Sequence, residues 1–191
     1  GSNGELGISS SLLNKMIERK MLSKTYIETG FTQSGIIGEL IEKNRRISQI
    51  DSLFFGDHLV EKVMVKTGSN GLIGNRFLSR QDIIIDWTNK QLHIKRNSEV
   101  VENGTFGLGF AQSDSLGFII KSIIVDGPAD KAGLKPMMKI LNFGGLDFEG
   151  GHNICDYISI QDQLNDSIQI SVLGINGKPS SYSLHKQKLF N

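Results

Sequence analysis

The sequence predicts a mainly β protein with a few helices, divided into two domains. Its 191 residues suit two domains of about 95 residues each, a common domain size. Short β-rich runs separated by glycine-containing turns recur along the chain, as expected for antiparallel hairpins. A polar stretch at 96–104 interrupts this pattern. We therefore expect one domain over residues 1–97 and a second over residues 104–191.

The first domain is expected to open with a helix and continue in three hairpins. Apolar residues recur at helical spacing from Leu12 to Met21, and Ser9 to Ser11 offer an N-cap. The paired β-rich runs are 25–29 with 35–41, 46–54 with 58–66 around Gly56-Asp57, and 83–87 with 91–95.

The second domain is expected to mix strands with two helices. We predict strands at 108–112, 117–125, 138–143, 167–173 and 180–187, and helices at 128–133 and about 153–165. Pro128 suits the first turn of a helix and Gly133 suits the position just past its end. Asn176-Gly177 favours the tight turn of the last hairpin.

Composition excludes several classes of function. The formal net charge is +1, from 21 basic and 20 acidic residues, so neither a nucleic acid nor an anionic membrane is expected as a partner. Cys155 is the single cysteine, which rules out an intramolecular disulfide. No apolar run reaches the roughly 18 residues that a membrane span needs. The four histidines lack metal-ligand spacing, so we expect no metal and no cofactor.

The second domain resembles a PDZ domain over about residues 104–188. The resemblance rests on Gly107-Leu108-Gly109-Phe110, the strand that follows, and Pro128-Ala129 with Ala132-Gly133-Leu134. It implies that the backbone amides of Leu108, Gly109 and Phe110 bind the carboxylate of a peptide or protein C-terminus. The peptide would lie between the strand from Phe110 and the late helix. Asn153, Cys155 and Asp156 are the candidates for the helix residue that sets ligand class. Met137-Met138 depart from the Gly-Asp that the family usually has.

The first domain resembles the lobe of a retropepsin-like aspartyl protease. The matching segment is Leu72-Ile73-Gly74-Asn75-Arg76-Phe77-Leu78, followed by a strand that ends in Asp86-Trp87 and a hairpin. The opening Gly1-Ser2 then corresponds to the second half of the family's Asp-Thr-Gly-Ser motif, as if the chain began immediately after Asp-Thr. The residues that match the protease motif are thus Gly1, Ser2, Leu72, Ile73 and Gly74. A lobe of this kind joined to a PDZ domain is a recurrent bacterial arrangement.

The resemblance implies a fragment of a bacterial aspartyl peptidase that contains no catalytic residue of its own. The parent enzyme would be an extracytoplasmic endopeptidase, periplasmic or secreted. Because aspartyl proteolysis needs two carboxylates that share a proton, a second lobe or a second copy would supply the other aspartate. A lobe without its partner lobe exposes apolar surface, so we expect a homodimer through the protease-like lobe, or docking of the PDZ domain onto that lobe. One alternative is a non-catalytic scaffold whose PDZ domain captures peptide C-termini, or a PDZ fold that serves only as a packed appendage. Another is that residues 1–95 are an unrelated small β-domain.

Overall fold

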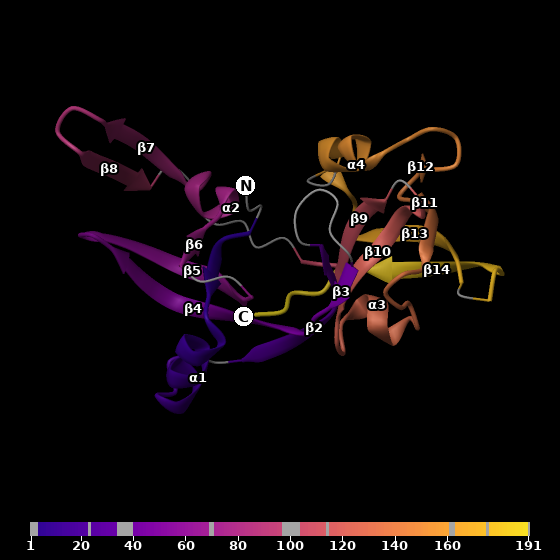
Figure 1. The fold of residues 1–191 in the computed structure, drawn as a ribbon, viewed down its shortest axis with the longest axis horizontal. Coiled ribbons are helices and arrows are strands. Elements are labelled where there is room, and N and C mark those ends of the chain that lie inside the picture. Colours follow the sequence, from indigo (N-terminus) through magenta and orange to yellow (C-terminus); the bar gives the residue numbers. More distant parts are fainter. Residues whose placement is uncertain are drawn as a thin grey trace. The chain divides into compact units, whose positions relative to one another are not determined.

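The computed structural model describes residues 4–22, 24–33, 40–68, 71–96, 104–113, 115–160, 163–174 and 176–190. The chain is mainly β, as predicted, and it divides into two compact units (Figure 1). Unit 1 contains residues 1–27, 45–102 and 190, and unit 2 contains residues 28–44, 103–189 and 191. Most of the predicted linker, residues 97–103, lies outside the described residues.

Unit 1 begins with a short strand that lies between two others. In chain order, the elements that belong to it are β1 (Leu6–Ile8), α1 (Ser10–Glu18), the start of β2 (Thr25–Gln33), β4 (Arg45–Phe55), β5 (His58–Thr67), β6 (Leu72–Ile73), α2 (Asn75–Leu78), β7 (Gln81–Asp86) and β8 (Gln91–Arg96). Strand β1 pairs in parallel with β5 and antiparallel with β6. The β4–β5 hairpin and the β7–β8 hairpin follow the predicted turns.

Helix α1 forms where the periodicity predicts it, because its cap and its apolar face agree. The Ser9 hydroxyl accepts a hydrogen bond of 3.1 Å from the Leu12 amide, which satisfies one free N–H of the first turn. Leu13 and Met16 are buried against Ile8, Ile50 and Val65. A second apolar cluster joins Val60, Val63 and Phe77, with Phe77 contributed by α2.

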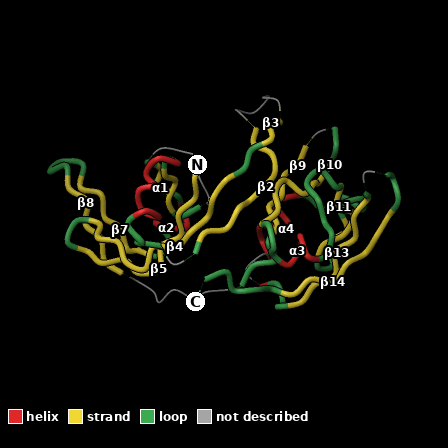
Figure 2. Tube along the Cα trace, turned by 90° about the horizontal axis from the view of Figure 1, so that it is seen from below, coloured by secondary structure: helices red, strands yellow, loops and turns green. Residues whose placement is uncertain are grey.

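Unit 2 is a sheet with two helices against it (Figure 2). After the second part of β2 and β3 (Leu40–Glu42), its elements are β9 (Leu108–Ser113), β10 (Gly117–Ile124), α3 (Pro128–Lys131), β11 (Lys139–Phe143), β12 (Leu146–Asp147), α4 (Ile154–Ile160), β13 (Ser167–Leu173) and β14 (Pro179–His185). Strand β10 pairs with β9, β11 and β2, and β13 pairs with β11 and β14.

The elements predicted for the second domain are all present, and both helices are shorter than expected. Helix α3 ends at Lys131, with Pro128 in its first turn and Gly133 just past its end at φ +87°. Helix α4 ends at Ile160, and residues 161 and 162 lie outside the described residues. Leu134, Ile140, Ile170 and Leu184 are among the most buried side chains of the core of unit 2.

The β2–β3 hairpin belongs to unit 2, although it lies early in the sequence. Phe31 pairs with Glu42, and the Lys43 amide donates to the Gly30 carbonyl at 2.8 Å. On its other edge β2 pairs with β10, where Gly30 lies opposite Ser122. The loop of this predicted hairpin, residues 34–39, lies outside the described residues.

Candidate functional sites

The first site lies in unit 1, where β1 pairs with the segment from Leu72 to Gly74. Leu6 pairs with Ile73 and Gly7 pairs with Leu72. The pairing extends beyond β6, because the Gly74 amide donates to the Glu5 carbonyl at 2.7 Å and the Arg76 amide donates to the Gly4 carbonyl at 3.2 Å. The start of the described chain is therefore hydrogen-bonded along the segment from Leu72 to Arg76.

The residues of this motif differ in their surroundings. Gly74 is buried and precedes α2, whose Phe77 is fully buried. Leu72 and Ile73 are 40% and 39% exposed, and β6 is the last strand in the order of the sheet. Gly1 and Ser2 lie outside the described residues.

A buried ion pair anchors Glu5, the residue that precedes β1. The Arg80 Nη1 atom lies 2.8 Å from Glu5 Oε1, with side-chain exposures of 11% and 6%. The other carboxylate oxygen of Glu5 accepts from the Met64 amide, and Arg80 Nη2 donates to the Glu61 carbonyl at 2.5 Å. Glu5 thus joins β1 to β5 and to the turn before β7. The sequence offered no signal for this pair, because Glu5 and Arg80 are 75 positions apart.

The second site is the glycine loop of unit 2. Gly107 adopts φ +75°, as expected of a loop glycine, and its amide donates to Thr105 Oγ1 at 3.1 Å. The Gly107 carbonyl accepts from the Ile124 amide at 3.0 Å. Leu108, Gly109 and Phe110, the predicted carboxylate-binding residues, follow as the first residues of β9 and are half-buried.

Gly109 has a different reason to be glycine. A Cβ atom at Gly109 would lie 2.3 Å from the Ser122 hydroxyl oxygen, so a side chain there collides with β10. Ser122 itself donates to the buried carboxylate of Glu28 on β2 at 3.0 Å. Ser122 and its neighbour Lys121 interrupt the apolar residues of β10, and this interruption was a sequence signal that sequence reasoning did not use.

Helix α4 lies beside β9. The Phe110 and Tyr157 rings pack edge to face with centroids 4.8 Å apart, and the Gln112 side chain accepts from the Ile154 amide at 3.0 Å. Ile158 on the same helix is 50% exposed. The contact between strand and helix is thus made by aromatic rings and by one side-chain hydrogen bond.

The three candidates for the ligand-class residue have separate roles. The Asn153 side chain accepts from the Cys155 amide at 2.8 Å, and Asp156 Oδ2 accepts from the Asn153 amide at 2.8 Å. This reciprocal pair resembles a capping box and stabilises the start of α4. Cys155 is exposed.

Comparison with protein families, with curated proteins and with solved structures gives no match for this chain. The two sites therefore rest on their own geometry. Within the described part of the chain, no helix is long and apolar enough to cross a membrane. The same residues contain no group of three or more His, Cys, Asp and Glu side chains placed to hold a metal ion.

Proposed function

We propose that unit 1 is one lobe of an aspartyl peptidase and that unit 2 contains a PDZ-type peptide-binding module. The observation that carries the first part is the pairing of Gly4–Gly7 with Leu72–Gly74. Leu72–Gly74 belong to the segment matched to the protease motif, and Gly4–Gly7 come shortly after the matched Gly1-Ser2, about 65 positions earlier in the sequence. A lobe of this kind needs them side by side, because the strand that follows the catalytic aspartate must be held firmly.

The chemistry follows from the position of this strand. If an Asp-Thr pair preceded Gly1, it would bring one carboxylate to the end of the segment that begins before Gly4. Gly74 and Arg76 hold this segment through hydrogen bonds to the Glu5 and Gly4 carbonyls. One carboxylate is insufficient, since proteolysis of this type uses two that share a single proton and activate a water molecule. A second copy related by a two-fold axis would supply the other carboxylate. On this proposal the described residues position the aspartate and contain no catalytic group.

The test is to extend the chain by Asp-Thr in front of Gly1 and to use an Asn-Thr extension as the matched control. We expect the Asp-Thr protein to cleave an unfolded protein such as casein in a pepstatin-sensitive reaction, and the Asn-Thr protein to be inactive. Equal activity of the two proteins, or activity that pepstatin leaves unchanged, would refute the peptidase assignment. An inactive but folded Asp-Thr protein would favour the scaffold alternative.

The peptide-binding part is supported by the arrangement of β9 and α4. The loop at Gly107, the half-buried Leu108 and Phe110, and Tyr157 on the facing helix combine backbone amides with an apolar wall. An extended peptide could add to β9 and place its last side chain against this wall. We expect a peptide with a free C-terminal carboxylate to bind more tightly than the same peptide with an amidated end. Fluorescence polarisation measures the difference, and equal affinities would contradict capture of a C-terminus.

A further inference from the structure

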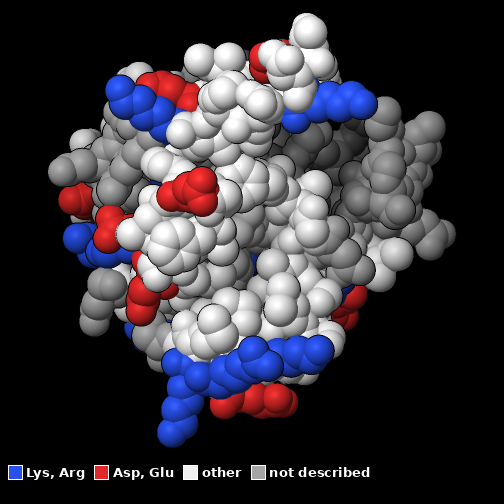
Figure 3. Space-filling model, turned by 90° about the vertical axis from the view of Figure 1, so that its left-hand side faces the viewer, with Lys and Arg blue, Asp and Glu red and all other residues white. Residues whose placement is uncertain are grey.

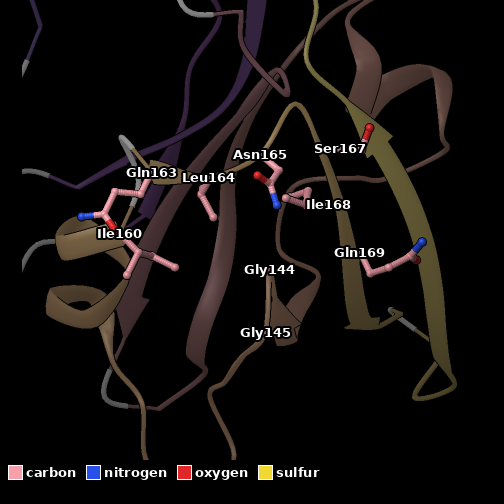
Figure 4. Close-up of a pocket in the computed structure, with 9 residues that line it drawn as sticks. All are labelled: Gly144, Gly145, Ile160, Gln163, Leu164, Asn165, Ser167, Ile168 and Gln169. Carbon is pink, nitrogen blue, oxygen red and sulfur yellow. The ribbon is translucent and has the colours of Figure 1, made fainter.

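We propose that unit 2 has a second peptide site, on a hollow formed beside the end of α4, and that this site binds an uncharged internal stretch of extended peptide. The hollow has a volume of about 460 Å³ and lies among the β11–β12 turn, the end of α4 and the start of β13 (Figure 4). Its size falls within the range of small-ligand sites. None of the residues predicted to bind a carboxylate lines it. Its lining residues are Gly144, Gly145, Ile160, Gln163, Leu164, Asn165, Ser167, Ile168 and Gln169.

The walls of the hollow are fixed by hydrogen bonds. Lys186 Nζ donates to the Leu164 carbonyl at 2.6 Å, and the Lys186 amide donates to the Asp166 carbonyl at 2.7 Å. On the opposite side the Gly144 amide donates to the Gln169 carbonyl at 3.0 Å. A site whose walls are already ordered loses little conformational entropy when a ligand binds.

The lining offers no charge that would attract an ion. The nine residues around the hollow, all within the described chain, include no ionisable side chain. The two amides of the glycine turn are already used, because Gly144 donates to the Gln169 carbonyl and Gly145 donates to Asn142 Oδ1 at 3.3 Å. A carboxylate or an ammonium group would therefore find no opposite charge on the lining.

The apolar part of the lining suits a branched aliphatic side chain. Ile168 is 7% exposed, and Leu164 is half-buried and packs against the core of unit 2. A Cβ atom at Gly144 would lie 3.0 Å from Leu164 Cδ2, so the glycine allows this close packing. At Gly145 the same atom would meet nothing within 4 Å, which leaves that side of the turn open.

The polar part of the lining suits a peptide group. Figure 4 shows the Asn165 carboxamide between Leu164 and Ile168, on the side toward the glycine turn. Within the described chain its side-chain amide has no protein partner, so it is available to a ligand. A carboxamide both donates and accepts, as one backbone peptide group does. The combination with the apolar floor points to an internal peptide segment rather than to a free chain end.

The experiment uses the full chain and the capped peptide acetyl-Ala-Leu-Ala-amide, with backbone amide shifts measured by NMR. We expect shifts at Gly144, Gly145 and Asn165, with a Kd in the millimolar range. Ile160→Asp should weaken binding by about tenfold or more, since it places a charge on the apolar wall. Ile158→Asp, on the same helix and outside the hollow, should change the affinity less than about twofold.

Two further peptides distinguish binding at the hollow from binding of a peptide C-terminus at Leu108 to Phe110. Acetyl-Ala-Asp-Ala-amide should bind at least about tenfold more weakly at the hollow, because it lacks the apolar contact of the leucine side chain and the lining offers its charge no partner. The free-acid form, acetyl-Ala-Leu-Ala, reports on Leu108 to Phe110 independently, so failure at one site leaves the other standing. Absence of shifts at 144–145 and 163–169 up to roughly 10 mM capped peptide would overturn the proposal. Equal binding of the Asp peptide, or equal effects of both isoleucine variants, would also overturn it.

Discussion

The Ser122 hydroxyl donates to the buried Glu28 carboxylate across the β2–β10 pair, at 3.0 Å. The same hydroxyl lies 2.3 Å from where a Cβ atom at Gly109 would stand. Ser122 therefore makes contact on both sides of β10, with the predicted peptide-binding strand β9 and with the hairpin that contains Glu28.

Gly109→Ala should destabilise unit 2 through this contact. The hydroxyl of Ser122 must rotate to admit the methyl group, and it then gives up the bond to a buried carboxylate, which costs about 1.5–3 kcal/mol. In a Ser122→Ala background the nearest atom to the new Cβ is 3.6 Å away, so the same substitution should cost less than about 1 kcal/mol. Urea unfolding of the four proteins in this cycle measures the coupling. Additive effects would show that Ser122 is not the reason for glycine at this position.

Met137→Gly is expected to stabilise unit 2. Met137 has φ +72°, a left-handed conformation that costs an L-residue with a side chain roughly 1 kcal/mol. The conformation is held because the Met137 amide donates to the Ile120 carbonyl at 2.8 Å and the Ile120 amide donates to the Met138 carbonyl at 3.0 Å.

The expected gain for Met137→Gly is about 0.5–1 kcal/mol, after the greater chain entropy of glycine in the unfolded state is subtracted. Thermal unfolding followed by circular dichroism measures it. Met138→Gly is the matched control, because Met138 does not have a positive φ, and it should be destabilising. A loss of stability in both variants would contradict the argument.

Local features of this fold could be predicted from the sequence, and contacts between distant segments could not. The Ser9 cap, the Gly56-Asp57 turn and the alternation in the later strands each act within a few residues, so pattern alone located them. Glycine at 107 was explained correctly by its dihedral angle.

The contacts that define the sites depend on register between strands, which no local pattern encodes. Position 109 requires glycine because β9 comes close to the Ser122 side chain, and Ser122 lies 13 positions later in the sequence. The ion pair of Glu5 with Arg80, and the membership of residues 28–44 in unit 2, follow likewise from the fold alone.

Arg80→Leu should destabilise unit 1 strongly. The substitution leaves the Glu5 carboxylate buried without its cation, and removing one partner of a buried ion pair costs about 3–5 kcal/mol. Arg80→Lys should retain part of the stability, because lysine keeps the charge but lacks the planar fork that also reaches the Glu61 and Lys62 carbonyls. Arg76→Leu, an exposed arginine on α2, is the control and should cost less than about 0.5 kcal/mol. A similar effect of both leucine variants in urea unfolding would show that the buried pair contributes nothing specific.

Asp130 should make unit 2 lose stability at acid pH. The Asp126 amide and the Lys135 ammonium, which donate to its carboxylate at 3.0 and 3.1 Å, lower the pKa of Asp130 in the folded state. A lowered folded pKa means that the contribution is fully present above the unfolded pKa and is lost as the pH falls through the folded pKa. As the pH falls from 7 to 2.5, the free energy of unfolding of the native protein should therefore approach that of Asp130→Asn. Urea unfolding at several pH values measures both proteins, and a gap that stays constant below pH 4 would contradict the assignment.

The β7–β8 hairpin is the surface through which we expect the chain to associate. It forms a two-stranded sheet of its own, and such a ribbon is marginally stable unless another surface covers it. Ile85 and Leu92 lie opposite each other and are 51% and 47% exposed, and Trp87 next to the turn is 82% exposed. Figure 3 shows a face of the molecule that carries both basic and acidic side chains.

Replacing both Ile85 and Leu92 with lysine should weaken this association. Charges at the centre of a self-complementary apolar contact face their own copies, and hot-spot positions of this kind commonly change affinity by about tenfold or more. Sedimentation velocity should give a concentration-dependent mass above 21.1 kDa for the native chain and the monomer mass for the variant. Leu116→Lys, at a 40% exposed leucine of unit 2, is the control and should associate like the native chain. A native chain that stays monomeric at high concentration would remove the dimer from the peptidase proposal and leave a second lobe as the source of the other carboxylate.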